Sequence, residues 1–205
     1  KFPTGLMDVQ DVVEWVFTNP SVLSGVGADA ALAGLAMVGD SAGGNLATVT
    51  TVEMKRVVPI RAQVLLYPHV STRPPVVDSI STSVAHNYRA PIVTPATLAT
   101  IHDLYLPTPA RDSLDPRASP LLYPEASLRG CPPTFLATAS HDPLTSNVVA
   151  YAARLRNANV VVELKHFRGT IHGFASMDMA DGFAELHTAM GSFLRRALGV
   201  RSASL

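Results

Sequence analysis

The chain has 205 residues and equal numbers of acidic and basic side chains, 16 of each, so its formal net charge is zero. This length can bury a sizeable core, most simply as one domain over residues 1–205. The balanced charge gives no electrostatic reason to expect nucleic acid or an anionic membrane as a partner. No apolar run approaches the ~18 residues that cross a bilayer, so we expect no stable membrane insertion.

A single cysteine, Cys131, excludes an internal disulfide and any metal site built from several cysteines. Beside two prolines, it is better explained as a small apolar side chain than as a reactive group. The balanced charge favours a small uncharged substrate. We also expect a cytoplasmic location, although the single cysteine indicates only that no disulfide is needed.

Apolar spacing predicts alternating helices and strands. In chain order we expect a helix over 8–17, a strand over 35–38, a helix over 42–56, a strand over 61–67, a helix over 94–105, a strand over 134–139, a helix over 146–157, a strand over 160–167 and a helix over 182–198. Strands that are apolar on both faces are typical of parallel sheets. The pattern therefore predicts an α/β fold with a mostly parallel sheet, flanking helices and right-handed crossovers.

Residues 71–133 interrupt this alternation and contain 11 of the 16 prolines. Such insertions usually lie over the carboxyl ends of strands, where open α/β sheets bind ligands. We interpret the segment as a cap or pocket wall. The alternative is an irregular surface excursion with no role in binding.

The segment Gly39-Asp40-Ser41-Ala42-Gly43-Gly44 stands between a predicted strand and a predicted helix. Strand, sharp turn and helix around Gly-x-Ser-x-Gly are the features of a nucleophile elbow, which lifts its serine clear of the sheet. We expect a Cβ at Gly39 or Gly43 to collide across the bend, and we expect Asp40 and Gly44 to help shape the turn. Ser41 is the predicted nucleophile, with the backbone N–H of Ala42 as an oxyanion donor.

A serine hydroxyl needs a base and an orienting acid. Asp142 follows the predicted strand over 134–139, and His172 follows the strand over 160–167. Because the carboxyl ends of parallel strands meet at one edge of a sheet, we expect Ser41, Asp142 and His172 to meet there. Their order along the chain is that of an α/β-hydrolase triad. The alternative for Asp142-Pro143 is a turn or a helix N-cap.

His141 is the main rival base because it adjoins Asp142, yet neighbouring side chains on an extended segment point to opposite faces. A metal site built from His141, Asp142 and His172 is a further alternative, but no ligand pair has the i, i+4 spacing of one helix face. We therefore predict no metal and no cofactor. The remaining histidines are interpreted as surface or satisfied core residues: His69, His86, His102, His166 and His187.

Several segments resemble the hormone-sensitive-lipase-like family of α/β-hydrolase esterases, in family order and at comparable spacing. Besides the elbow, they are Lys1-Phe2-Pro3, Leu65-Leu66-Tyr67-Pro68, Asp115-Pro116-Arg117-Ala118-Ser119-Pro120-Leu121, Asp142-Pro143-Leu144 and His172-Gly173-Phe174. The resemblance implies an α/β-hydrolase sheet and a serine carboxylesterase or lipase that cleaves short to medium acyl esters through an acyl-enzyme. It also implies that Ser41 is the nucleophile, His172 the acid–base and Asp142 the orienting acid, and that residues 71–133 contribute to a cap.

The sequence also departs from the family pattern. The family has a His-Gly-Gly-Gly oxyanion motif and several strands upstream of the segment that begins here with Lys1-Phe2-Pro3, and it usually has Arg-Asp where this chain has Thr145-Ser146. We therefore expect the carboxyl-terminal portion of a longer esterase, or a truncated product, whose sheet lacks the N-terminal strands. The strand before Ser41 would then be an apolar edge that could self-associate or pair with another chain.

Two alternatives to an active esterase stay open. A catalytically weak or dead fragment is one, because only one oxyanion donor is in place. The other is a binding protein on a hydrolase scaffold, since the resemblance extends to plant gibberellin receptors, which keep the serine and lose the histidine. The presence of His172 favours the enzyme.

Overall fold

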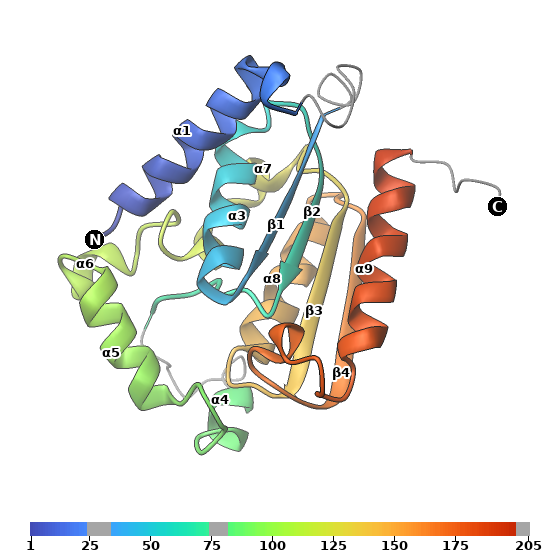
Figure 1. Cartoon of the computed structure of the whole chain (residues 1–205). Coiled ribbons are helices and arrows are strands. Elements are labelled where there is room, and N and C mark those ends of the chain that lie inside the picture. The colour runs from blue at the N-terminus through green and yellow to red at the C-terminus, as the bar shows by residue number, and fades with distance from the viewer. Residues whose placement is uncertain (24–33, 74–81, 200–205) are drawn as a thin grey trace.

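The computed structural model describes residues 1–23, 34–73 and 82–199. In these residues four strands form one sheet in the spatial order β1-β2-β3-β4. The strands are β1 (Leu35–Asp40), β2 (Ile60–Leu66), β3 (Thr134–His141) and β4 (Val162–Ile171). Every neighbouring pair is parallel, so all four strands end at the same edge (Figure 1). The predicted parallel α/β sheet is confirmed.

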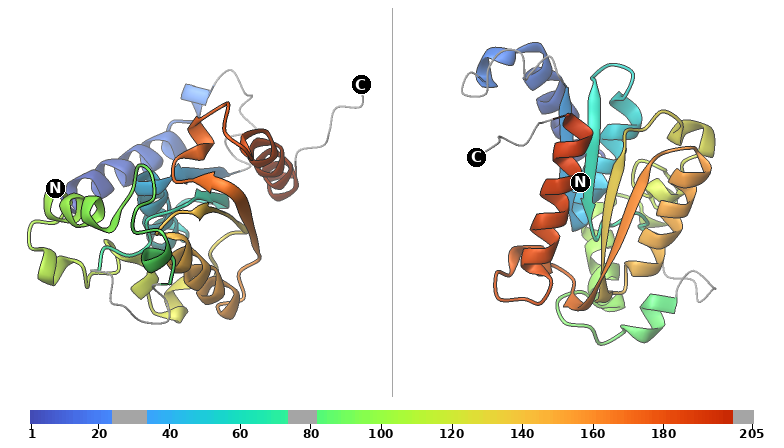
Figure 2. Two further views of the ribbon diagram at one scale, coloured as in Figure 1. Left: turned by 90° about the horizontal axis from the view of Figure 1, so that it is seen from below. Right: turned by 90° about the vertical axis from the view of Figure 1, so that its right-hand side faces the viewer.

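In the part of the chain that the structure describes, four long helices flank the sheet: α1 (Thr4–Thr18), α3 (Ser41–Met54), α8 (Thr145–Asn157) and α9 (Phe183–Leu198). Figure 2 shows α9 on one face of the sheet and α8 on the other. The shorter helical segments are Pro20–Leu23, α4 (Thr82–His86), α5 (Pro95–Tyr105), α6 (Pro109–Asp112), Pro120–Leu122, α7 (Glu125–Leu128) and Phe174–Ser176. The result is a helix–sheet–helix layering that buries both faces of the two central strands, β2 and β3.

Alternation along the strands divides the core into two clusters. Leu65 and Leu136 pack on the face covered by α3 and α8, whereas their neighbours Val64 and Phe135 pack on the face covered by α9. All four side chains are essentially inaccessible to solvent. Because successive side chains of a strand point to opposite faces, an apolar run such as 64–66 serves both clusters.

The insertion predicted over 71–133 contains, in its described residues, five of the short helical segments: α4, α5, α6, Pro120–Leu122 and α7. Figure 1 shows α4 and α5 at the end of the molecule where the strands finish. The helix α5 begins with a capping box in which Thr94 and Thr97 bond reciprocally, and Pro95 occupies its first turn. Residues 74–81 of the insertion lie outside the described residues, and its role as a cap stays a prediction.

Element boundaries differ most from the predicted ones in α1, which begins at Thr4 and not at residue 8, and in β4. The strand predicted over 160–167 instead covers 162–171, because its backbone pairing continues past an irregularity in the register until Ile171 lies opposite His141. Periodicity of side chains cannot detect such an extension, since it is made by backbone hydrogen bonds. As a consequence, Asp142 and His172 each directly follow the last residue of a strand.

The strand β1 lies at one edge of the four-stranded sheet formed by the described residues. Its Val38 side chain is 52% exposed, although it belongs to an apolar strand. The expected pairing of this edge with another chain stays a prediction. Among the helices in the described ranges, none combines the length and apolar character needed to cross a membrane.

Replacing Leu136 by alanine tests the packing of the sheet against α3 and α8. Leu136 is fully buried in this cluster, so Leu136→Ala should lower the free energy of unfolding in urea by about 2–5 kcal/mol, through lost apolar burial and the cavity left behind. Val161→Ala is the control, because Val161 is 66% exposed and its loss should cost only about 0.5 kcal/mol. Equal losses in the two variants would contradict this packing.

Candidate active site

The turn between β1 and α3 holds Ser41 in a strained conformation. Ser41 has a φ of 49°, in the left-handed region that residues with a Cβ rarely adopt, and it is the first residue of α3. Such strain is stored where the surrounding structure fixes the backbone. The side chain of Ser41 is thereby presented half-buried at the edge where the strands end.

Two glycines make this turn possible, and they are not the pair expected from the sequence. A Cβ on Gly39 would lie 2.3 Å from the carbonyl oxygen of Gly43, and a Cβ on Gly44 would lie 2.8 Å from the Cβ of Pro68. A Cβ on Gly43 would meet only Asp40 Oδ1 at 3.8 Å within the described part of the chain. The expected collision at Gly43 is therefore wrong: its backbone is the obstacle for Gly39, while its own Cβ direction points into open space.

Ser41, His172 and Asp142 form a continuous chain of hydrogen bonds. The Nε2 atom of His172 lies 2.8 Å from Ser41 Oγ, and its Nδ1 atom lies 2.8 Å from Asp142 Oδ2. With Nδ1–H donating to the carboxylate, Nε2 is free to accept the serine proton. The structure thus brings together the three side chains that the sequence placed at three separate strand ends.

Burial makes the carboxylate–imidazole contact strong and fixed. Asp142 is completely buried, and His172 is only 4% exposed. The second carboxylate oxygen, Oδ1, accepts a hydrogen bond from the backbone N–H of Leu144 at 2.8 Å. Both carboxylate oxygens are therefore satisfied, as a buried charge requires. Asp142 also shapes the local turn through this bond, so the turn interpretation and the orienting role are compatible.

Tyr67 is a neighbour of this cluster that the sequence did not assign to the site. It directly follows β2 with a φ of 37°, is fully buried, and its ring centroid lies 4.8 Å from that of His172. Burial, with the nearby Asp40 carboxylate as a second cause, raises the pKa of Tyr67 to about 12, so its hydroxyl stays neutral. Its role here is to hold the imidazole in place by contact. The signals in the sequence were its place at the end of an apolar strand and its membership of the Leu65-Leu66-Tyr67-Pro68 segment, one of those that resemble the esterase family.

A pair of buried histidines joins the insertion to the elbow. His69 Nε2 lies 3.1 Å from Nε2 of His102, which belongs to α5, and the backbone N–H of His69 donates to Ser41 O at 3.0 Å. Asn45 of α3 adds two hydrogen bonds from its side-chain amide, to His69 O at 2.6 Å and to Ala118 O at 3.0 Å. Burial lowers the pKa of His69 to about 3, and it also lowers the pKa of His102.

The other histidines are not part of this chain of hydrogen bonds. His141 is exposed beside the fully buried Asp142, as expected for neighbours on opposite faces of an extended segment. His166 bonds to Thr138 Oγ1, His187 bonds to the Phe183 carbonyl, and His86 is the last residue of α4. Within the residues that the structure describes, no cluster of three or more His, Cys, Asp or Glu side chains could hold a metal ion.

The backbone N–H of Ala42 is well placed for an oxyanion donor. Ala42 is exposed in the first turn of α3, where the first amide groups have no acceptor within the helix. The helix dipole adds partial positive charge at this end. A negatively charged oxygen bound next to Ser41 would therefore be stabilised from this side.

Two pockets adjoin the elbow and the insertion. The first, called here the inner pocket, has a volume of about 140 Å³ and is lined by Ala42, Leu46, His69, Ile101, His102 and Tyr105, together with Asn45 and Thr72. The second, called the outer pocket, has about 430 Å³ and lies under α5 and α6. Thr72 and His102 line both, so they stand between the two pockets.

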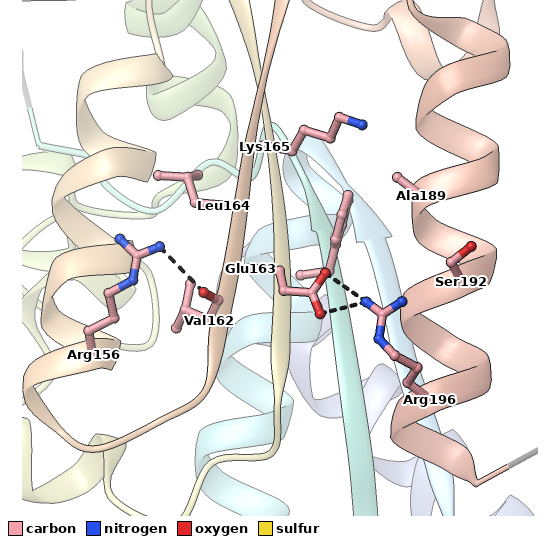
Figure 3. A pocket seen from close by; sticks show the side chains of 9 residues that line it. Arg156, Val162, Glu163, Leu164, Lys165, Ala189, Ser192 and Arg196 are labelled. Carbon is pink, nitrogen blue, oxygen red and sulfur yellow. Dashed lines mark hydrogen bonds and ion pairs between the residues drawn. The ribbon is translucent and has the colours of Figure 1, made fainter.

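A larger pocket of about 540 Å³ lies between β4 and α9 (Figure 3). Its charged side chains already have partners: Arg196 Nη2 donates to both oxygens of Glu163, at 2.7 and 2.9 Å, and Arg156 donates to Val162 O. None of Ser41, Asp142 and His172 lines it. This pocket is therefore separate from the chain of hydrogen bonds at the elbow.

Comparison with known sequences places these features in context. A family model described as the alpha/beta hydrolase fold matches residues 1–176. The chain is 35% identical over 182 residues to ethyl acetate hydrolase of Pseudomonas putida, which covers 86% of this chain and 52% of that protein. It is 32% identical over 203 residues to the carboxylesterase NlhH of Mycobacterium tuberculosis, covering 96% of this chain and 60% of that protein.

The fold is also similar to that of a solved esterase structure. Carboxyl esterase 2 of the mycorrhizal fungus Tuber melanosporum superposes with a TM-score of 0.85 at 26% identity, covering 97% of this chain and 64% of that one. The present chain thus spans between about half and three fifths of the length of the two sequence relatives named.

Alanine at the two neighbouring glycines tests the geometry of the turn. Gly39→Ala should lower the free energy of unfolding by more than about 2 kcal/mol, because its Cβ would overlap backbone atoms that cannot move independently of the turn. The matched variant Gly43→Ala should stay within about 1 kcal/mol of the parent, since its Cβ has space and alanine favours a helix. Urea denaturation measures both, and the reverse ranking would refute the geometry.

The depressed pKa of His69 predicts how stability responds to acid. Between its ordinary value of 6.5 and about 3, the unfolded chain binds a proton at this residue that the folded chain does not bind. The free energy of unfolding should therefore fall on acidification, with this group adding a slope of up to about 1.4 kcal/mol per pH unit. Urea denaturation from pH 7 to pH 4 should show a shallower fall for His69→Gln. Parallel slopes would argue against the buried neutral imidazole.

Proposed function

Because the chain belongs to the hormone-sensitive-lipase-like group of the α/β-hydrolase fold family, we propose that it carries the nucleophile, base and acid of a serine carboxylesterase. The family resemblance predicted from the sequence is confirmed by the match over residues 1–176. The proposed activity is that of the whole protein, and its proposed substrates are esters of short to medium acyl groups.

One observation carries this proposal: the hydrogen-bonded chain from Ser41 through His172 to the buried Asp142, at 2.8 Å for each link. A nucleophile, a base and an acid that orients the base are what acyl transfer by serine requires. The names of the sequence relatives, an ethyl acetate hydrolase and a carboxylesterase, favour esters as the substrate class.

In the first half of the proposed reaction, Ser41 Oγ attacks the ester carbonyl while His172 Nε2 takes its proton. Asp142, which bonds to Nδ1, keeps the imidazole in the required tautomer and stabilises the imidazolium that forms. The backbone N–H of Ala42 donates to the oxyanion of the tetrahedral intermediate. His172 then passes its proton to the departing alcohol oxygen, and an acyl group remains on Ser41.

In the second half, a water molecule attacks this acyl-enzyme. His172 accepts a proton from the water, and a second oxyanion forms at the same donor. When the intermediate collapses, the carboxylic acid leaves and Ser41 regains its proton from His172. The half-buried position of Ser41 suits both steps, since ester and water must reach the same oxygen.

We further propose that residues 71–133 act as a cap or pocket wall over this centre. Support comes from the position of α4 and α5 at the end of the sheet where the strands finish, and from the His69–His102 contact (Figure 1). A segment fixed in this place can select substrates without taking part in the bond-making steps.

Covalent labelling with an organophosphonate tests the proposed nucleophile. We expect one adduct, located by mass spectrometry on Ser41, and none in Ser41→Ala. His172→Ala should slow labelling by about 1,000-fold or more, and Asp142→Asn should reduce kcat for 4-nitrophenyl acetate by a similar or larger factor, because the base loses its correct tautomer.

His141→Ala is the matched control for these variants. It removes an exposed imidazole next to Asp142 and should leave labelling and turnover close to those of the parent protein. An adduct on another residue, or a loss in His141→Ala as large as that in His172→Ala, would overturn the assignment.

A further inference from the structure

The inner pocket lies next to the elbow, and Ser41 itself is not one of its lining residues. Its walls include Ala42, the residue that follows Ser41, and the ring of His69, whose backbone bonds to Ser41 O. His172 is not among its lining residues. In ester cleavage the alcohol oxygen must face the proton-bearing imidazole, so a pocket that borders Ala42 and not His172 fits the acyl side of the scissile bond.

His102 ends this pocket. The side chain projects from α5, lines the inner pocket and the outer pocket, and is 7% exposed. Its position is fixed by the 3.1 Å contact of its Nε2 atom with Nε2 of His69. The two rings are within 11° of parallel, and their centroids are 5.0 Å apart. Such a short contact between ring nitrogens needs one donor and one acceptor, so at least one imidazole is neutral.

His69 is itself held firmly, so the partition between the pockets is rigid. Its backbone N–H donates to Ser41 O, and its carbonyl oxygen accepts from the side chain of Asn45. Burial keeps the pKa of His69 and that of His102 below their ordinary values, and both rings are therefore neutral near pH 7. A neutral pair can keep this hydrogen bond while it faces an apolar pocket.

We propose that the inner pocket binds the acyl group of the substrate and that His102, held by His69, is the specificity-determining residue that limits acyl length. This inference rests on the proposed esterase function and adds a substrate range to it. An apolar cavity of about 150 Å³ holds a benzene-sized molecule, so a volume of about 140 Å³ accommodates acyl groups of up to about six carbon atoms.

The outer pocket explains why His102 limits the length of the acyl group. With about 430 Å³ and walls that include Ala99, Pro109, Ala110 and Leu114, it has room for several further methylene groups. In the parent protein the imidazole of His102 blocks the way to it. Removing that ring should join the two volumes and admit longer chains along a mostly apolar path.

A series of 4-nitrophenyl esters from acetate to decanoate, used below their micelle concentrations, tests the inference. For the parent protein, kcat/KM should fall by about tenfold or more between hexanoate and octanoate, because a pocket that rejects a methylene discriminates by roughly that factor. In His102→Ala, the ratio of kcat/KM for octanoate to that for butyrate should rise at least about tenfold.

Three further variants separate the effect of the His102 side chain between the two pockets from other effects of substitution. Asp103→Ala changes a residue that lines only the outer pocket, and the parent preference should remain. The double variant His102→Ala with Ala110→Phe refills the outer pocket and should return the preference to short acyl groups. His102→Leu keeps a side chain between the two pockets but removes the hydrogen bond to His69. Its preference for acyl length can therefore be measured even where His102→Ala unfolds at low temperature.

The outcomes distinguish this inference from the proposed function. Absence of turnover for every ester, together with absence of an organophosphonate adduct on Ser41, would remove the proposed function itself. Normal turnover and labelling with the same acyl profile in the parent, His102→Ala and the double variant would overturn only the inference. A series of acetate esters with alcohols of increasing length should show no change in His102→Ala, and a shift there would assign the pocket to the alcohol group instead.

Discussion

Contact between backbone atoms at the end of β1 determines where the candidate nucleophile lies. Gly39 packs against the carbonyl of Gly43, and Gly44 packs against Pro68, at distances that exclude any side chain at the two glycines. The chain must therefore turn sharply and enter α3 with Ser41 at a φ of 49°. The position of Ser41, the exposed first turn of α3 and the bond from His69 to Ser41 O all depend on this close approach.

The parallel strands also position the side chains that form the hydrogen-bonded chain with Ser41. Asp142 and His172 are the first residues beyond β3 and β4. Because these strands end at the same edge as β1, both residues lie close to Ser41. Residues separated by 131 positions in the sequence thus meet at hydrogen-bond distance. The energetic cost of burying the Asp142 carboxylate is offset by two short hydrogen bonds, one from His172 and one from the backbone of Leu144. Both bonds also restrict how the imidazole can rotate.

The sequence predicted the features that repeat along the chain or depend on one local pattern. Apolar runs revealed the four strands, and the order of Ser41, Asp142 and His172 relative to them indicated a common edge. Features made by distant backbone contacts were beyond such reasoning. The pairing that extends β4 to Ile171, the room beside Gly43 and the fit of Gly44 against Pro68 depend on how segments approach one another. Tyr67 was noted only as part of the Leu65-Leu66-Tyr67-Pro68 segment. Its contact with His172 and the His69–His102 pair were missed because each joins residues far apart in the sequence.

Hydrogen bonds join residues 70–72, where the insertion begins, to residues 119–121 within it. The backbone N–H of Leu121 donates to Val70 O at 2.8 Å, and that of Thr72 donates to Ser119 Oγ at 2.9 Å. The side-chain amide of Asn45 donates to Ala118 O at 3.0 Å. The chain therefore leaves this place near Thr72 and returns to it near Ala118, and the entropic cost of closing such a loop grows only slowly with its length. Because the closure holds the flanking residues next to the elbow, a change in the length or sequence of the loop between them would leave the position of Ser41 unaltered.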